Sequence, residues 1–176
     1  MPRSSWGTMI AHAGVGVMVL GLTGASAWRV ERIEVMKPGQ TMEVAGVVLT
    51  FKGARPDRGP NYEEVRGSFD VHEDGKLVTT LETARRVYVQ PKMPTTETGI
   101  YPFWSGDLYI ALGDPNEKNP GAFTVRVFFN PLVNLIWIGA LIMFLGGAVS
   151  LTDRRYRVGA PRRARRRMIK TAGQNA

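Results

Sequence analysis

The sequence predicts a membrane protein of the α+β class, in which two transmembrane helices flank an antiparallel, barrel-like or sandwich-like extracytoplasmic β domain. Residues 4–28 and 128–152 contain no Asp, Glu, Lys or Arg. Each stretch is long enough for the about 20 residues that a helix needs to cross a hydrocarbon core. The segment between them alternates apolar and polar residues and is punctuated by turn signals, which is typical of β-strands.

The first uncharged stretch predicts a short cytoplasmic N-terminus at residues 1–5 and a transmembrane helix at residues 6–28. Trp6 and Trp28 bracket this helix, as interfacial aromatic residues do. A cleaved signal peptide is the alternative, because residues 25–27 (Ala-Ser-Ala) fit an A-x-A cleavage site. The apolar run of about 20 residues exceeds the 7–15 residues of a signal-peptide core, which favours a retained helix.

The second uncharged stretch predicts a transmembrane helix at residues 131–152. This run is apolar on every face and lacks the polar stripe of a soluble surface helix, and Pro131 suits a helix start. Residues 153–176 carry nine basic residues and one acid, so by the positive-inside rule this basic tail is cytoplasmic. Both termini are then cytoplasmic, and residues 29–130 form a domain on the outer side of the membrane. Topology accounts for the basic residues, and we expect no nucleic-acid binding.

The outer segment is expected to fold as about seven strands with no long helix. The predicted strands are residues 30–36, 42–52, 68–73, 76–82, 86–90, 107–112 and 123–129. Asp74-Gly75 separates two of these runs and is a strong hairpin signal. Residues 91–98 predict a polar loop. This spacing of turn signals favours a small antiparallel barrel or sandwich.

The absence of cysteine excludes several kinds of chemistry from this chain. Disulfides, thiolate metal sites, cysteine nucleophiles and covalent haem attachment through a CxxCH motif all need cysteine. The sequence also contains no glycine-rich phosphate loop and no nucleophile elbow. We therefore assign no catalytic residue.

His12 is the most informative candidate for a functional residue. It lies about one and a half turns past Trp6, inside the first predicted span, where an ionisable residue is costly and usually has a partner. Gly16 is one turn further on the same helix face and would let another helix or a flat cofactor approach the backbone. One interpretation is an axial ligand of a membrane-embedded b-type haem. The other is an interhelical hydrogen bond, and the residues alone leave both open.

Two further residues have weaker signals. His72 lies at the predicted hairpin tip and is therefore expected to be solvated. A metal contact beside the acids Glu73 and Asp74 is the alternative, but without further ligands its signal is weak. Trp104 lies in a segment with four aromatic residues between Gly99 and Tyr109. Most of these aromatics are expected to serve the core, while a tryptophan at a loop tip suits a contact with a partner.

The order of several motifs resembles the C-terminal part of the CcmF family, the haem lyase subunit of cytochrome c maturation. The motifs that carry the resemblance are Trp6-Gly, Ala11-His12-Ala-Gly-Val15, Met36-Lys-Pro-Gly39, Arg58-Gly-Pro-Asn-Tyr62, Asp107-Leu-Tyr-Ile-Ala-Leu-Gly113, Asn130-Pro-Leu-Val-Asn-Leu-Ile-Trp-Ile-Gly139 and Asp153-Arg-Arg-Tyr-Arg157. Each motif alone is modest. Their order and spacing extend over nearly the whole chain.

The resemblance implies that His12 is one of two intramembrane histidines that hold a b-haem. It also implies partners: other haem lyase subunits or the N-terminal part of the same protein, a periplasmic haem chaperone, and the apocytochrome c that receives the haem. The chain is much shorter than the family, and it lacks the tryptophan-rich loop, the periplasmic histidines and the second b-haem histidine. We therefore expect a split subunit or a fragment, and Met1 ahead of the first span favours a split subunit.

Three hypotheses follow from the sequence. The leading one is a haem lyase component that shares a haem b through His12 and presents a periplasmic docking domain, with the catalytic parts elsewhere. The second is a non-enzymatic, membrane-anchored assembly or scaffold protein whose β domain binds a periplasmic protein. The third is an exported domain with a cleaved signal peptide and a single C-terminal anchor.

Overall fold

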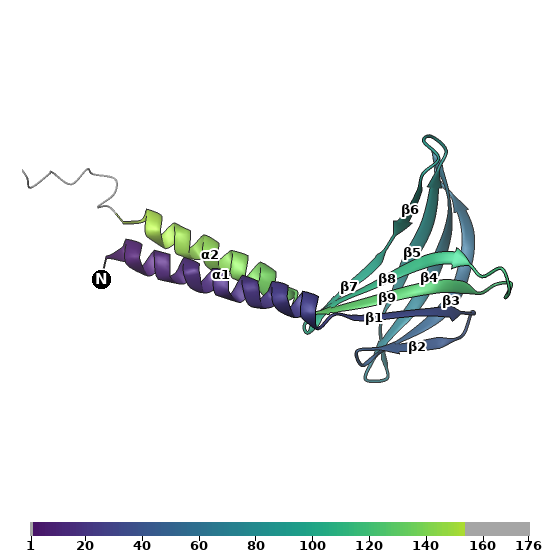
Figure 1. Cartoon of the computed structure of the whole chain (residues 1–176), viewed down its shortest axis with the longest axis horizontal. Helices are drawn as coiled ribbons and strands as arrows, with labels where there is room; N and C mark the ends of the chain where they lie inside the picture. Colours follow the sequence, from purple (N-terminus) through teal and green to yellow (C-terminus); the bar gives the residue numbers. More distant parts are fainter. Residues whose placement is uncertain (1, 154–176) are drawn as a thin grey trace, which may run out of the picture. The chain divides into compact units, whose positions relative to one another are not determined.

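The computed structural model describes residues 2–153 and contains two helices and nine strands within them (Figure 1). The basic tail lies outside the described residues from position 154 onward. The helices are α1 (Arg3–Ala27) and α2 (Asn134–Leu151). The strands are β1 (Val30–Met36), β2 (Thr41–Val44), β3 (Val47–Arg58), β4 (Tyr62–Glu73), β5 (Lys76–Tyr88), β6 (Pro94–Glu97), β7 (Gly99–Phe103), β8 (Gly106–Pro115) and β9 (Phe123–Pro131).

The strands form two antiparallel sheets, as predicted for this segment. One sheet has the order β1-β9-β8-β7 and the other the order β2-β3-β4-β5-β6. β1 pairs with β9 along its whole length, from Val30 opposite Phe129 to Met36 opposite Phe123. The strand that follows α1 is thus paired with the strand that precedes α2.

The hydrophobic core is built from the facing sides of the two sheets. Phe51 and Phe69 stack with ring centroids 4.9 Å apart, and Phe123 meets Phe51 edge-on at 6.2 Å. The other fully buried core side chains are Met36, Val44, Leu49, Val71, Leu108, Ile110, Leu112, Val125 and Val127. The buried residues alternate along the long strands, because successive side chains of a strand point to opposite faces.

Several strand assignments differ from the sequence-based prediction. Residues 42–52 form two strands rather than one, because Ala45 and Gly46 both adopt positive φ angles, 52° and 83°, and reverse the chain. The runs 76–82 and 86–90 are one continuous strand, β5. The polar loop predicted at residues 91–98 is wrong in part, since Pro94–Glu97 pairs with β5 as the edge strand β6.

The predicted start of the second helix is also wrong. Pro131 does not begin the helix but ends β9, where it pairs with Gly106 of β8. Leu132 then adopts a positive φ of 59° and turns the chain, and α2 begins at Asn134. The second uncharged stretch, residues 128–152, therefore contains the end of β9 and a turn before α2 begins.

The described chain divides into two compact units. One unit holds α1 up to Gly16 together with α2 from Ile138, and the other is Val17–Trp137, which includes all strands. In the first unit, a Cβ atom built on Gly7 would lie 2.5 Å from the carbonyl oxygen of Gly146. The two helices therefore approach each other at backbone distance, which only small residues allow.

The same glycine stripe continues in the second unit. A Cβ atom built on Gly21 would lie 2.7 Å from the backbone nitrogen of Ile136, and one on Gly24 would lie 2.9 Å from a methyl group of Leu132. Within each unit, contacts move backward along α2 as they move forward along α1, so the helices run antiparallel.

Polar groups of α1 are satisfied largely by its own backbone. The Thr8 hydroxyl donates a hydrogen bond to the Ser4 carbonyl at 3.0 Å, and the Ser26 hydroxyl donates to the Leu22 carbonyl at 2.8 Å. The backbone nitrogen of Ser4 donates to Asp153 Oδ2 at 3.0 Å, which satisfies one of the free N–H groups at the start of a helix. Such internal pairing is what a lipid environment requires.

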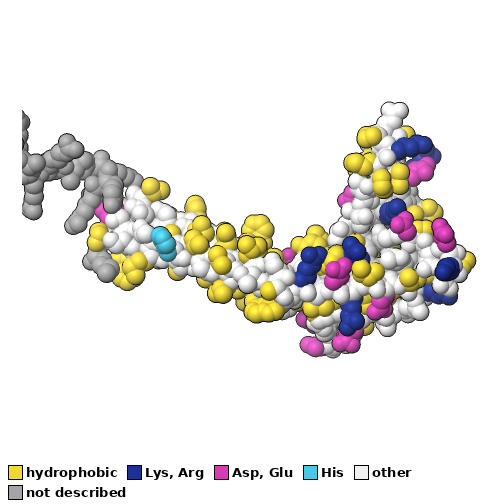
Figure 2. All heavy atoms as spheres, in the orientation of Figure 1, with side chains coloured by type: hydrophobic (Ala, Val, Ile, Leu, Met, Phe, Trp, Pro, Cys, Tyr) yellow, Lys and Arg dark blue, Asp and Glu magenta, His cyan; other side chains and the backbone are white. Residues whose placement is uncertain are grey.

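Both helices are long and apolar enough to cross a membrane. Only 17% and 11% of their most apolar windows are buried, unlike the core helix of a soluble protein. Figure 2 shows that, on the face in view, hydrophobic side chains line the helices while Lys, Arg, Asp and Glu gather over the strands.

Candidate functional site

His12 lies on the face of α1 that does not contact α2. Its side chain is exposed. The Nδ1 atom lies 2.9 Å from the backbone carbonyl oxygen of Thr8, one turn earlier on the same helix. A carbonyl oxygen can only accept a hydrogen bond, so Nδ1 carries the proton and donates it. In the neutral imidazole this leaves Nε2 unprotonated, with a lone pair available for a metal ion.

This arrangement is the one that a metal-ligating histidine requires. Ligating histidines usually donate the other ring N–H to a carbonyl or carboxylate, which fixes the tautomer and the ring orientation. Thr8 supplies that carbonyl, and the Thr8 hydroxyl is itself bonded to Ser4. His12 can therefore offer one nitrogen ligand to an iron centre.

Gly16 leaves open space one turn beyond His12. A Cβ atom built on Gly16 meets no atom of the described residues within 4 Å, in contrast to the other glycines of α1. The predicted Gly16 face therefore does not pack on α2. The residues present fit a planar apolar cofactor, because His12 provides a ligand and Gly16 leaves room beside the backbone.

Small residues on a helix let either a neighbouring helix or a flat cofactor approach its backbone. The structure separates them into two faces. Gly7, Gly14 and Gly21 contact α2, whereas His12 and Gly16 do not. Their direction could not be read from the sequence, because the contact face depends on where α2 packs.

His72 is less solvated than predicted. It lies in β4 beside the expected hairpin at Asp74-Gly75, where both turn residues have positive φ. The side chain is half-buried, and Nδ1 has no hydrogen-bond partner among the described residues. No cluster of three or more His, Cys, Asp or Glu residues occurs within residues 2–153 that could hold a metal ion.

Trp104 lies at the tip of the hairpin that joins β7 and β8. Its neighbour Phe103 is buried and contacts the rings of Tyr101 and Phe129, as predicted for most of this aromatic segment. Trp104 itself points into solvent and is 90% exposed. The strand β7 was not predicted from the sequence.

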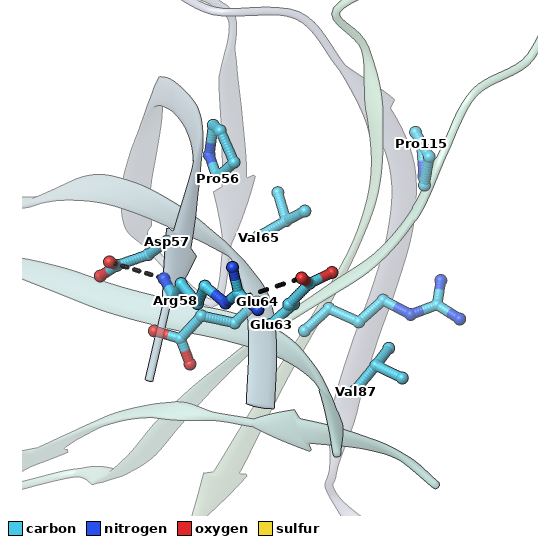
Figure 3. A pocket seen from close by; sticks show the side chains of 9 residues that line it. Pro56, Asp57, Arg58, Glu63, Glu64, Val65, Val87 and Pro115 are labelled. Atoms are coloured by element: carbon cyan, nitrogen blue, oxygen red, sulfur yellow. Dashed lines mark hydrogen bonds and ion pairs between the residues drawn. The ribbon is translucent and has the colours of Figure 1, made fainter. Parts of the chain in front are cut away.

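A groove that no sequence pattern indicated lies against β3, β4 and β5 of one sheet, with Pro115 of the other sheet at its side (Figure 3). It has a volume of about 810 Å³ and is lined by Pro56, Asp57, Arg58, Glu63, Glu64, Val65, Arg85, Val87 and Pro115. At its rim, Arg58 Nε lies 3.8 Å from Glu63 Oε1. These residues come from β3, β4, β5 and β8 and form no sequence motif, so no local signal could have identified the groove.

Asp107 lies next to the Trp104 hairpin and lacks a partner for one oxygen. Its Oδ1 atom is buried without a hydrogen bond to any described residue. Burial raises the pKa of this carboxyl. A raised folded-state pKa means that wild-type stability increases as pH falls through that pKa toward the unfolded value.

We expect Asp107→Asn to increase stability at neutral pH, with an advantage that shrinks as pH falls toward about 4. The matched control is Asp70→Asn. A hydrogen bond from Thr80 and then one from Lys52 hold the pKa of Asp70 below its usual value, so this variant is expected to lose stability at neutral pH. Urea unfolding at several pH values measures the stability of both variants. A loss of stability in both would contradict the view that Asp107 is destabilised by burial.

Comparison with known proteins places these features in a family. A family model described as the CcmF C-terminal beta-sandwich matches residues 27–131. The cytochrome c-type biogenesis protein CycK of Rhizobium meliloti is 45% identical over 166 residues, covering 94% of this chain and 24% of that protein. CcmF of Pseudomonas aeruginosa is 42% identical over 176 residues, covering 100% of this chain and 26% of that protein.

A solved structure has the same fold. The structure named Cytochrome c Heme Lyase CcmF matches with a TM-score of 0.65 and 21% identity, covering 85% of this chain and 25% of that chain. The chain thus spans about a quarter of the length of the relatives that it matches.

Proposed function

Because the chain belongs to the CcmF C-terminal beta-sandwich family, we propose that it acts in cytochrome c maturation as part of a haem lyase assembly and that His12 provides one axial ligand to an intramembrane b-haem. The relatives named as cytochrome c-type biogenesis proteins support a role of this chain in cytochrome c maturation. The observation that carries the site is the hydrogen bond from His12 Nδ1 to the Thr8 carbonyl, which leaves Nε2 of this exposed side chain available as a ligand.

In this proposal the chain has a defined topology. Helices α1 and α2 cross the inner membrane, the strand domain lies in the periplasm, and both termini are cytoplasmic. The uncharged stretches at residues 4–28 and 128–152 and the basic tail support this orientation.

The residues of this chain would position rather than transform the substrate. His12 would hold one side of the haem iron, and Gly16 would leave the apolar macrocycle room against the helix. The bound haem would supply one-electron redox chemistry. The second ligand and the haem-attachment chemistry would lie on another chain or segment of the assembly, and the strand domain would dock against the haem chaperone or apocytochrome c.

The proposal is tested by a reduced-minus-oxidised haem spectrum of the chain co-purified with the rest of the haem lyase assembly. We expect His12→Ala to reduce the b-type spectrum strongly, because the haem iron would lose one of its two protein ligands. Thr8→Val is the matched control, since it removes a hydroxyl but keeps the carbonyl that accepts from His12. An unchanged spectrum in His12→Ala would favour the scaffold hypothesis, in which this histidine only packs.

Gly16→Leu provides a second, independent prediction. The described residues leave open space at Gly16, so leucine is expected to leave the helix pair intact while it displaces a haem bound against this face. The b-type spectrum should be reduced at least about fivefold, which corresponds to about 1 kcal/mol of lost binding. Leu22→Phe, at an exposed position of α1 that lies off the face shared by His12 and Gly16, should retain the spectrum. Full haem occupancy in Gly16→Leu would contradict the placement of the haem on this face.

A further inference from the structure

The hairpin between β7 and β8 presents the most exposed large hydrophobic side chain of the described residues. Trp104 is 90% exposed at its tip. The indole ring is large and apolar and can donate one hydrogen bond, so moving it from water into an apolar or interfacial environment is favourable.

Hydrogen bonds hold this hairpin tip against the start of α2. Asn134 Nδ2 donates to the carbonyl oxygens of Phe103, at 2.8 Å, and Trp104, at 3.2 Å. The backbone nitrogen of Leu132 donates to the carbonyl oxygen of Ser105 at 3.0 Å. The backbone of Trp104 is therefore fixed beside the residues that begin α2, and both belong to the unit Val17–Trp137.

Gly106 makes this close approach feasible. A Cβ atom at this position would meet the carbonyl oxygen of Asn130 and lie 2.8 Å from Cα of Pro131. Only glycine lets the β7–β8 turn lie against the end of β9. The position of the tip is thus built into the backbone.

The composition of the tip differs from that of the loop at the other end of β8. Residues 98–106 contain no charged side chain, whereas the loop between β8 and β9 carries Glu117 and Lys118. Two further exposed tryptophans lie in the same unit, Trp28 just after α1 and Trp137 in the first turn of α2. An uncharged aromatic tip beside a helix that enters a membrane suits the bilayer interface.

We infer that the Trp104 hairpin is a third membrane contact, which inserts its indole ring into the lipid headgroup region of the outer leaflet beside the entry of α2. This inference rests on the proposed crossing of the membrane by α1 and α2. Tryptophan is enriched at this depth because its ring body is apolar and its N–H can bond to headgroups or water. The contact would fix the height of the strand domain above the bilayer.

The experiment uses the full chain in vesicles of palmitoyl-oleoyl-phosphatidylcholine. Replacing Trp6, Trp28 and Trp137 with Phe leaves Trp104 as the single indole. Its fluorescence is measured with lipids brominated near the headgroup or near the bilayer centre, and with acrylamide in the water. We expect a blue-shifted emission and stronger quenching by the shallow bromines than by the deep ones.

The matched control moves the indole to the other end of the same strand, with Trp104→Phe and Glu117→Trp. β8 has ten residues, so this reporter lies about 30 Å along the strand. Brominated lipid should quench Trp104 at least about twofold more than this reporter. Equal lipid quenching, or red-shifted emission of Trp104 with strong acrylamide quenching, would overturn the anchor and favour a protein-docking role.

Flotation of the vesicles separates this inference from the proposed topology. If the chain floats with the vesicles after alkaline washing while Trp104 stays in water, the helices cross the membrane and only the anchor is wrong. If the chain does not float, the proposed membrane crossing by α1 and α2 is wrong, and so is the membrane contact of Trp104 that rests on it. Circular dichroism of each variant establishes that the strands are retained.

Discussion

Replacing Gly146 with leucine is expected to break the pairing of α1 with α2. A Cβ atom at Gly146 would lie 2.5 Å from the backbone nitrogen of Ala11 and 2.7 Å from the carbonyl oxygen of Gly7. These are backbone atoms, so no side-chain movement can relieve the overlap. We expect a loss of about 3 kcal/mol in the free energy of helix association, at the upper end of overpacking effects. An SDS titration of the full chain in detergent micelles, followed by circular dichroism and fluorescence, measures the loss.

Gly147→Leu is the matched control, one residue further along the same helix. A Cβ atom at Gly147 meets no described atom within 4 Å. The two variants have the same composition, helix propensity and hydrophobicity, so they differ only in whether the new leucine points toward α1 or away from it. Equal midpoints for Gly146→Leu and Gly147→Leu would show that α2 does not contact α1 through this face.

Glu64→Gln is expected to produce the largest loss of stability of any single charge change in the strand domain. The Glu64 side chain is fully buried and accepts hydrogen bonds from Arg66 Nη2 at 2.6 Å and from Arg86 Nε at 2.9 Å. Each arginine also pairs with a second, more exposed glutamate: Arg66 with Glu82 at 3.0 Å and Arg86 with Glu97 at 3.1 Å. Glu64 thus joins two ion pairs into one network, and an amide there leaves two guanidinium groups without their shared anion.

The effect of this variant depends on pH in a defined direction. Burial raises the pKa of Glu64, but hydrogen bonds from Arg86 and Arg66 outweigh burial and hold the pKa below its usual value. A lowered folded-state pKa contributes stability that is present above the unfolded pKa and is lost as pH falls through the folded one. Since solvent partly screens the arginines, we expect Glu64→Gln to cost about 2 kcal/mol at neutral pH, and less below about pH 4.

Glu63→Gln provides the control on the same strand. Its carboxylate is 70% exposed and pairs with Arg58 at 3.8 Å, an arrangement expected to contribute less than about 0.5 kcal/mol. Urea unfolding at neutral and acidic pH compares the two variants. Losses of equal size, or a Glu64→Gln loss that grows on acidification, would be inconsistent with a buried anion at the centre of the network.

The parts of the fold that local chemistry determines could be predicted from the sequence. The Asp74-Gly75 turn and the strand Val30–Met36 are confirmed at their predicted positions. The two uncharged stretches do contain helices. In each case the signal lies in neighbouring residues, as turn conformation or as an alternating or unbroken apolar pattern.

The parts that long-range pairing determines could not be predicted. β6 (Pro94–Glu97) is polar, and it is a strand only because β5 offers its edge. Glu64 and Arg86 lie 22 positions apart and meet through the register of β4 and β5. For the candidate site, the residue types at His12 and Gly16 indicated a ligand and an open face. Their orientation away from α2 needed the structure.

The pairing of β1 with β9 has a consequence for the connection between the two helices. Val30 and Phe129 are held opposite each other, at the about 5 Å that separates paired residues of antiparallel strands. The β1–β9 pairing therefore keeps the end of α1 close to the start of α2, although about a hundred residues of chain separate them. The entropy cost of joining two segments rises with the length of free chain between them. Separating β1 from β9 would release that length and weaken the helix pair from a distance.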